Sequence, residues 1–221
     1  MIPDLQTGIR DKNYCIKSVA VIVAHPDDET LWVGGMILSN PFAQWFIVCL
    51  SRKRDKERAT RFGQALKVLG ADGVMGDLDD GPNQKPVANK VVEDLIMKLL
   101  PHRHYDLIIT HNPSGEYTRH LRHEETSNAV LRLWNSDKID ASELWTFAYE
   151  DGNKAYYPRA IQTAFICQKL WGDVWFKKYR IITETYGFAT NSWEALTTPE
   201  TEAFQQIFKQ KDIKKKQIIN T

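Results

Sequence analysis

The amino-acid sequence predicts a single α/β domain with a mostly parallel sheet and helices on both faces. Through the first half of the chain, apolar strand-like runs alternate with segments of helical periodicity, which is the pattern of parallel strands joined by crossover helices. The chain has 221 residues, of which 43% are hydrophobic and 26% charged, as in an ordinary globular protein. No repeat, low-complexity segment or Gly-, Pro- or Ser-rich linker divides it, so we expect one domain over residues 1–221.

The first half of the chain contains four predicted strands, each followed by a predicted helix. The strands are expected at 18–24, 44–50, 73–76 and 105–110, and the helices near 30–39, 55–69, 87–100 and 123–135. The first strand is typical of a buried parallel strand because β-branched residues fill it without a polar interruption. The third helix is amphipathic, with Val91, Leu95 and Leu99 near one face, and Pro101 ends it.

The second half is less regular and rich in aromatic residues. Its strands are expected at 143–150, 160–167 and 180–185, and its helices around 168–178 and at 199–210. Trp171 and Trp175 are four residues apart, the spacing of one helix face, and we expect them in the core. Beyond the last helix, the cations of KQKDIKKKQ (209–217) indicate a solvated basic tail from about residue 210.

The composition argues against several classes of partner. Lys and Arg number 29 against 28 Asp and Glu, a net charge of +1, so no bulk field recruits nucleic acid or an anionic membrane. No run of about 18 apolar residues predicts a membrane span, and the N-terminus lacks an apolar signal-peptide core. The three cysteines never form CxxC, which favours reduced thiols. We therefore expect a cytoplasmic protein that binds neither nucleic acid nor membrane, and the sequence is compatible with a homo-oligomer.

The turn after the first strand offers ligands for a cation. Its sequence, AHPDDE, lacks the glycines of a dinucleotide-binding turn, and the chain contains neither GxxxxGK[ST] nor GxSxG. Asp27, Asp28 and Glu29 instead stand side by side, which costs stability unless a positive charge lies among them. A helix cap would explain one or two of these acids but not the neighbouring His25. The turn therefore predicts a metal ion.

The fourth strand runs into a second ligand-rich loop, HNPSGEYTRHLRHEE. Parallel strands place both loops at the same edge of the sheet, and four of the six histidines lie in them. Two imidazoles and one carboxylate with an open position are typical of catalytic Zn²⁺, and Fe²⁺ or Co²⁺ would accept the same set. The spacing alone does not determine which of these residues are the metal ligands. His25 and Asp28 can face one point, His120 and His123 share a face if they are helical, and Asp27 can point past the metal at its bound water.

AHPDDE together with HLRH (120–123) resembles the LmbE-like, or PIG-L, family of zinc-dependent N-acetyl-sugar deacetylases. The resemblance extends to KVLGADG and GDLDDGP (67–82), ITHNPSGEYTRHLRHEE (109–125) and LWTFAYEDG (144–152). It implies a Rossmann-like sheet and a zinc site with His25, Asp28 and His123 as the metal ligands. It further implies that Asp27 is the general base and that His120 acts as an acid or oxyanion stabiliser.

Further residues are candidates for a substrate pocket. The loop SRKRDKERATR is dense in cations where many relatives carry a glycine. Its Arg52 and Arg54 could bind a phosphate or carboxylate, or could simply be solvated. The other candidates come from the loop after the fourth strand and from the turn GDLDDGP: His111, Asn112, Glu116, Tyr117 and Asp80.

The expected function is that of a zinc-dependent N-deacetylase, which removes an acetyl or similar small acyl group from an amino-sugar-containing small molecule. Amide hydrolysis needs an activated water, a polarised carbonyl and a proton for the leaving amine, which a metal, Asp27 and His120 would supply. A metal-dependent amidase acting on a non-sugar conjugate would carry the same motifs. A non-catalytic, metal-stabilised protein that binds a glycan or metabolite would have no use for Asp27, since four protein ligands normally close a structural zinc site.

Overall fold

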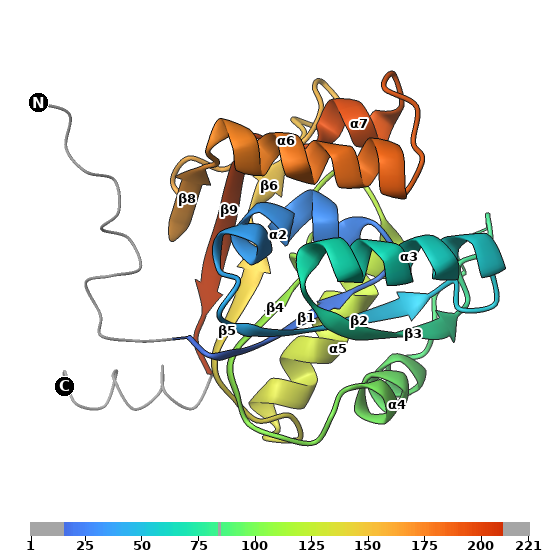
Figure 1. Cartoon of the computed structure of the whole chain (residues 1–221). Coiled ribbons are helices and arrows are strands. Elements are labelled where there is room, and N and C mark those ends of the chain that lie inside the picture. The colour runs from blue at the N-terminus through green and yellow to red at the C-terminus, as the bar shows by residue number, and fades with distance from the viewer. Residues whose placement is uncertain (1–15, 84, 210–221) are drawn as a thin grey trace, which may run out of the picture.

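The structure, a computed structural model, describes residues 16–83 and 85–209, and its centre is a seven-stranded sheet (Figure 1). The strand order is β3-β2-β1-β4-β5-β9-β8, and β6 and β7 form a separate two-stranded sheet. The strands are β1 (Ser18–Val23), β2 (Gln44–Ser51), β3 (Asp72–Leu78), β4 (Tyr105–Thr110), β5 (Ala141–Phe147), β6 (Tyr149–Glu150), β7 (Arg159–Ala160), β8 (Ile166–Lys169) and β9 (Thr201–Ile207). β1 to β5 pair in parallel, whereas β9 runs antiparallel to both of its neighbours.

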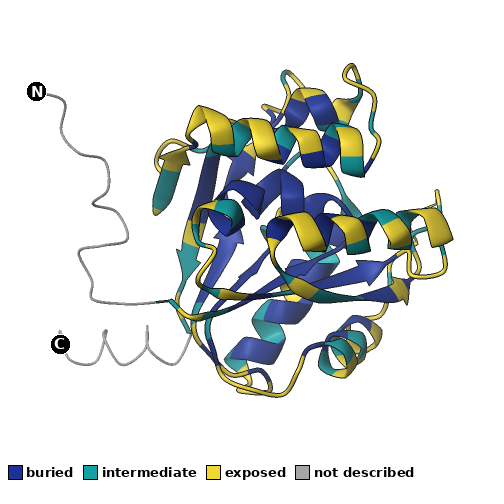
Figure 2. Ribbon diagram, in the orientation of Figure 1, coloured by how far each residue is buried: buried dark blue, intermediate teal, exposed yellow. Residues whose placement is uncertain are grey.

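Helices cover both faces of this sheet. The helices α2 (Asp28–Ser39), α3 (Lys56–Leu69) and α6 (Gly172–Arg180) lie on one face, and α4 (Asn89–Leu99) and α5 (Leu121–Asn135) lie on the other (Figure 1). The π-helix η1 (Ile181–Thr185) continues α6, and the short α7 (Trp193–Thr197) follows it. Two apolar cores result, and Figure 2 shows buried residues gathered in the sheet and on the helix sides that face it. The predicted α/β class, with a mostly parallel sheet covered on both faces, is confirmed.

The position of β1 decides where the candidate site lies. Val19 and Val21 pack in the core under α2 and α3, while Ala20 and Ile22 pack in the core of α4 and α5. A strand buried on both faces is apolar throughout, so its polar neighbours begin only at its end. β2 and β3 lie on one side of β1, whereas β4 and β5 lie on the other, so the winding reverses between β1 and β4. Ligands in α/β folds bind in the crevice at such a reversal.

The elements predicted for the first half are confirmed, with boundaries that differ by a few residues. Asp55 caps α3 by accepting a hydrogen bond from the N–H of Arg58 at 3.1 Å, and Gly70 ends the helix in a left-handed conformation. The single domain over 1–221 stays a prediction, because the basic tail expected from about residue 210 lies outside the described residues.

Two predictions for the end of the chain are wrong. The predicted helix at 199–210 is replaced over 201–207 by β9, which pairs with both β5 and β8 and sets Phe204 against the rings of Trp145 and Phe147. The tertiary context overrides the local pattern, because the sheet offers this segment two partner strands. The predicted strand at 180–185 is helical instead, since η1 occupies 181–185.

The region between β5 and α6 also differs from the prediction. The predicted strand at 143–150 is split between β5 and β6, and a turn between β7 and β8 interrupts the one predicted at 160–167. The aromatic helix begins at Gly172 rather than near residue 168, because the preceding residues belong to β8. Trp171, expected in the core, precedes this helix and is 74% exposed.

A residue from the C-terminal half of the chain forms hydrogen bonds to the middle of α2. Glu202 of β9 accepts hydrogen bonds from the N–H groups of Gly35 and Met36, both at 2.7 Å, and from the Lys178 ammonium at 2.7 Å. A Cβ at Gly35 would lie 2.4 Å from Cδ1 of Leu170 and 3.0 Å from Oε1 of Glu202. Glycine at this position therefore lets the buried carboxylate reach the helix backbone.

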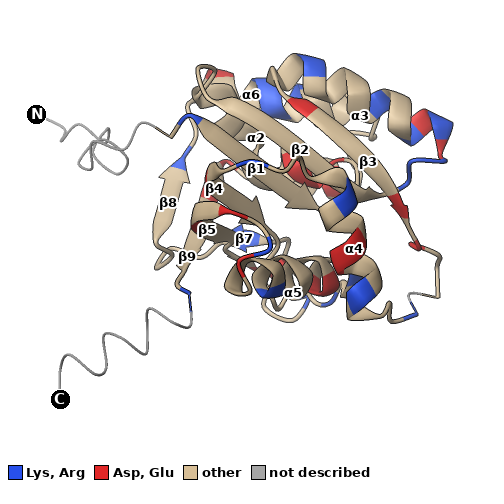
Figure 3. Cartoon of the chain, turned by 90° about the horizontal axis from the view of Figure 1, so that it is seen from below, with Lys and Arg blue, Asp and Glu red and all other residues tan. Residues whose placement is uncertain are grey.

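Charges on the helices are mixed in sign. Figure 3 shows Lys and Arg interspersed with Asp and Glu along α3, α4 and α5. Among the described residues, every helix is too short or too polar to cross a bilayer.

The buried pair of Lys178 and Glu202 yields a stability prediction. Glu202→Ala should lower the free energy of unfolding by about 3–5 kcal/mol, because it leaves the buried ammonium without its carboxylate. The control is Glu200→Ala, which removes an exposed partner of Lys169 and should change stability by less than about 1 kcal/mol. Urea unfolding measures both, and equal shifts in the two variants would contradict the prediction.

Candidate metal centre

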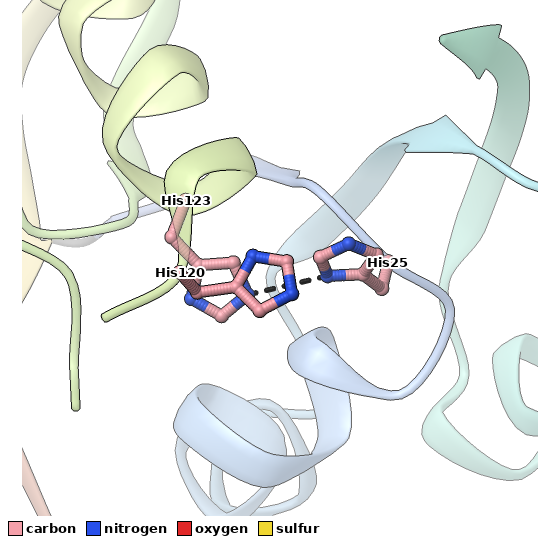
Figure 4. Close-up of side chains that lie close together, drawn as sticks. All are labelled: His25, His120 and His123. Carbon is pink, nitrogen blue, oxygen red and sulfur yellow. Dashed lines mark hydrogen bonds between the residues drawn. The ribbon is translucent and has the colours of Figure 1, made fainter. Parts of the chain in front are cut away.

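The two ligand-rich loops meet at the carboxyl ends of β1 and β4, which are adjacent parallel strands. β1 ends at Val23 and leads into His25, while the chain after β4 enters α5 at Leu121. His120 and His123 therefore lie at the start of α5, and both rings approach His25 (Figure 4). The sheet topology thus brings together side chains that are far apart in the sequence.

Three donor atoms from these loops lie at mutual distances that suit a tetrahedral metal ion. Nδ1 of His25 is 3.2 Å from Nε2 of His123 and 3.2 Å from Oδ2 of Asp28. Oδ2 of Asp28 is 3.5 Å from Nε2 of His123. Donor atoms about 2.1 Å from a tetrahedral ion lie about 3.4 Å apart, so this triangle has the size of one face of such a site.

Carboxylates behind the two imidazoles bind the nitrogen of each ring that faces away from this triangle. The Nε2 of His25 lies 3.2 Å from Asp80, and the Nδ1 of His123 lies 2.6 Å from Glu116. Each of these nitrogens donates its proton to the carboxylate, so the opposite ring nitrogen is the one that could bind an ion. The Asp28 carboxylate in turn accepts hydrogen bonds from the backbone N–H of His25 at 2.8 Å and from the Trp32 indole N–H at 3.2 Å.

His111 supports this centre from behind. Together with Asp28 and His123 it forms one of two other groups whose donor atoms lie within 4.8 Å of one another. Its Nε2, however, accepts the N–H of Ala24 at 3.0 Å, and its Nδ1 donates to Glu116 at 2.9 Å. Both nitrogens are therefore engaged, so His111 orients Glu116 rather than offering a lone pair to an ion.

His120 completes the other of these two groups, with His25 and His123. Its ring stacks on His123 with a centroid distance of 4.5 Å. Its Nδ1 is buried and has no hydrogen-bond partner among the described residues. Burial, together with the nearby His123 and His25, lowers the pKa of His120 to about 3, which favours the neutral imidazole.

Asp27 has an unusual backbone conformation. Its φ is 125°, in the region that favours glycine, and its N–H donates to Oε2 of Glu29 at 3.0 Å. Its carboxylate lies 3.7 Å from Arg58. Burial and the neighbouring charge of Asp28 raise the pKa of Asp27, while Arg58 and His25 oppose the rise.

The electrostatic environment favours a cation where the donor atoms converge. Burial alone would lower the pKa of His25, but hydrogen bonds and charge interactions with Asp28 and Asp80 outweigh it and raise this pKa to about 10. Four buried or half-buried carboxylates lie beside this position: Asp27, Asp28, Asp80 and Glu116. A divalent ion bound by His25, Asp28 and His123 would satisfy this excess of negative charge.

A cavity of about 520 Å³ opens in front of the centre. Its walls combine the catalytic candidates with apolar, aromatic and charged side chains: His25, Pro26, Asp27, Asp28, Leu31, Arg52, Arg58, Asp80, Gly81, Pro82, Tyr117, His120, Trp193 and Glu194.

Of the residues predicted for a substrate pocket, Tyr117, Arg52 and Asp80 line this cavity. His111 and Glu116 lie buried beneath the candidate metal ligands, and Asn112 donates to the carbonyl oxygen of Phe147 at 3.2 Å. Arg54 lies on the surface, where it forms an ion pair of 2.7 Å with Asp77.

Four cavity residues outside the two turn motifs were not identified from the sequence: Leu31, Arg58, Trp193 and Glu194. Arg58 belongs to the cationic segment SRKRDKERATR but lies in the first turn of α3, so the N-cap signal at Asp55 could have identified it. Trp193 and Glu194 begin the short α7, and no motif marks them in the sequence.

Comparison with known proteins gives one family match. The sequence model of the PIG-L family, described as GlcNAc-PI de-N-acetylase, matches residues 20–134, more than half of the chain. An uncharacterized protein of Acanthamoeba polyphaga mimivirus is 24% identical over 146 residues, a match that spans 59% of this chain and 61% of the viral protein.

Two solved structures show the same fold. N,N'-diacetylchitobiose deacetylase from Pyrococcus horikoshii has a TM-score of 0.65 at 18% identity, over 92% of this chain and 87% of that one. GalB, the 4-carboxy-2-hydroxymuconate hydratase from Pseudomonas putida, has a TM-score of 0.60 at 16% identity, over 87% of this chain and 97% of that one. Since these two neighbours are described by different reactions, the fold alone does not identify the chemistry.

The hydrogen bond between Glu116 and His123 leads to a prediction about metal affinity. Glu116→Gln should weaken Zn²⁺ binding about 10–100-fold, because it removes the carboxylate that orients the ligand. Glu124→Gln is the matched control in the first turn of α5, since Glu124 pairs with Arg119. Competition with a chromogenic chelator measures both affinities. Unchanged binding in Glu116→Gln would contradict the assignment of His123.

The raised pKa of His25 leads to a second prediction. Below a pH of about 10, the pKa of His25, the imidazole of this residue carries a proton that an incoming ion must displace. If one proton is released, the apparent Zn²⁺ affinity should rise about tenfold per pH unit between about pH 6 and 8. Chelator competition across this range tests it, and an affinity independent of pH would show that no proton is displaced.

Proposed function

The chain belongs to the PIG-L family, and from this premise we propose that it is a metal-dependent N-deacetylase acting on an amino-sugar-containing small molecule. The observation that carries the proposal is the triangle of His25, Asp28 and His123, which faces a cavity that Asp27 and His120 also line. A structural metal site would be closed by a fourth protein ligand, whereas a catalytic site keeps a position for water and substrate.

His25, Asp28 and His123 would hold the metal, and their donor set of two imidazoles and a carboxylate suits Zn²⁺, with Fe²⁺ or Co²⁺ as alternatives. When bound, such an ion supplies a Lewis acid for the acyl oxygen and lowers the pKa of a water molecule. Asp80 and Glu116 keep the two imidazoles in the tautomers that binding requires.

Asp27 would act as the general base. Its carboxylate lines the cavity beside Asp28, and its raised pKa makes it a stronger base than an exposed aspartate. It would take a proton from the attacking water and deliver it to the nitrogen of the departing amine. Arg58, 3.7 Å away, would keep the carboxylate turned into the cavity.

His120 would stabilise the oxyanion that forms when water adds to the acyl carbon. Because its pKa is lowered to about 3, it would act as a neutral hydrogen-bond donor rather than as an imidazolium acid. Its place on the cavity wall, beside the metal ligands, suits this role.

The cavity suits a ring with both apolar and polar faces. Leu31, Tyr117 and Trp193 provide apolar and aromatic surface, while Arg52 and Glu194 provide polar groups. A non-sugar amide remains the alternative substrate. The cytoplasmic location stays a prediction of the sequence, which is also compatible with a homo-oligomer.

The general-base assignment is tested by Asp27→Asn. This variant should keep its metal but lose about 10²–10⁴-fold in kcat, because it removes the proton acceptor and leaves the ligands in place. Asp77→Asn, in an ion pair with Arg54 on the surface, should retain full activity.

Acetate release from a panel of N-acetylated amino sugars and non-sugar N-acetyl amides, before and after chelation, provides the assay. A metal-loaded protein that is inert toward the sugars but cleaves a non-sugar amide would replace the proposed substrate class. Activity unaffected by chelation would overturn the metal-dependent mechanism.

A further inference from the structure

Glu29 follows the candidate ligand Asp28 and is completely buried, yet it does not line the cavity. Its two carboxylate oxygens have different partners. Oε2 accepts the N–H of Asp27 at 3.0 Å, whereas Oε1 accepts the hydroxyls of Tyr186 at 2.7 Å and Thr30 at 2.6 Å. This carboxylate therefore joins the backbone of the candidate general base to a tyrosine far away in the sequence.

The backbone at Asp27 needs such support. A φ of 125° is one that residues with a side chain rarely adopt, and it persists only where the surroundings hold it. The carbonyl oxygen of Asp27 accepts the N–H groups of Thr30 and Leu31, which fixes the C-terminal side of the residue. The hydrogen bond to Glu29 fixes its N-terminal side, so the two together set the direction in which the Asp27 side chain leaves the chain.

Tyr186 is placed for this contact by the π-helix. Its N–H bonds to the carbonyl oxygen of Ile181 at 2.8 Å, five residues earlier, at the end of η1. The side chain is 1% exposed, in the core that includes Trp32 of α2 and Phe62 of α3. Tyr186 also lies beyond residues 20–134, the segment that the family model matches.

We propose that Tyr186 is a positioning residue, which acts through Glu29 to hold Asp27 in the orientation that hydrolysis requires. The inference rests on the proposed function, because it assigns the geometry of the general base. The Tyr186 hydroxyl keeps the Glu29 carboxylate from rotating, and the fixed carboxylate pins the peptide N–H of Asp27. Within the described part of the chain, Tyr186 does not line the cavity, and its hydroxyl bonds to Glu29 and to none of the candidate metal ligands.

The test is Tyr186→Phe, which keeps the ring and removes the hydroxyl. The expected result is a fall in kcat of about tenfold, with KM within about twofold and the bound metal unchanged, because a small misplacement of the base affects the reaction more than binding. The matched control is Tyr149→Phe. The Tyr149 hydroxyl is also buried and donates to α2, at the carbonyl oxygen of Trp32, but among the described residues it forms no hydrogen bond with Glu29 or Asp27. This control should keep its kcat.

Coupling to Asp27 separates positioning from a general loss of stability. In the Asp27→Asn background, Tyr186→Phe should cause no further loss of kcat, since its effect passes through the missing base. Amide hydrogen exchange gives a readout that does not depend on activity. The N–H of residue 27 should exchange faster in Tyr186→Phe than in the unaltered protein or in Tyr149→Phe.

The outcomes distinguish this inference from the proposed function. If Asp27→Asn is inactive but Tyr186→Phe has unaltered kcat and unaltered exchange at residue 27, the positioning role is overturned and the proposed function stands. If Asp27→Asn remains fully active as a deacetylase, the general-base assignment fails, and the positioning role fails with it. Equal losses of kcat in Tyr186→Phe with and without Asp27 would also overturn the inference.

Discussion

One oxygen atom, Oε2 of Glu116, lies 2.6 Å from Nδ1 of His123 and 2.9 Å from Nδ1 of His111. An ionised carboxylate can only accept hydrogen bonds, so both imidazoles must present N–H groups to it. Each ring is then left with a lone pair on its opposite nitrogen. That of His111 takes the N–H of Ala24, and that of His123 faces His25 and Asp28. A single buried acceptor thus fixes the tautomers of two histidines, and with them the geometry of the candidate metal centre.

The parts of the fold that could be predicted are those decided by local sequence. β1 is apolar throughout because both of its faces are buried, and α3 carries its own N-cap and a terminal glycine. β9 is different. Its residues form a strand because they can pair with both β5 and β8. The local sequence pattern of 201–207 does not indicate that these partner strands are present. The π-helix likewise follows from how the chain after α6 packs on α2 and α3, not from its own periodicity.

The candidate site could be located from the sequence because a parallel sheet brings the ends of neighbouring strands together. Topology predicts that the loops after β1 and β4 meet, and the structure places them in contact. It does not predict which nitrogen of His25 faces Asp28, since that depends on Asp80, which approaches from the turn after β3. Trp193 and Glu194 were missed for a related reason, because they reach the cavity from a short helix without a motif.

The bonding of the C-terminal half to α2 affects how this fold can be dissected. Gly35, Met36 and Glu29 all lie within the family-matched residues 20–134, but Glu202 and Tyr186, which bond to them, lie outside it. In a fragment ending at residue 134, the Glu29 carboxylate and the N–H groups of Gly35 and Met36 would lose these partners. This loss would lower the free energy of unfolding of the fragment. The matched segment therefore lacks hydrogen-bond partners that its own buried groups use. A design that moves the HPDDE turn and α2 into another protein would have to replace the contacts of Tyr186 and Glu202.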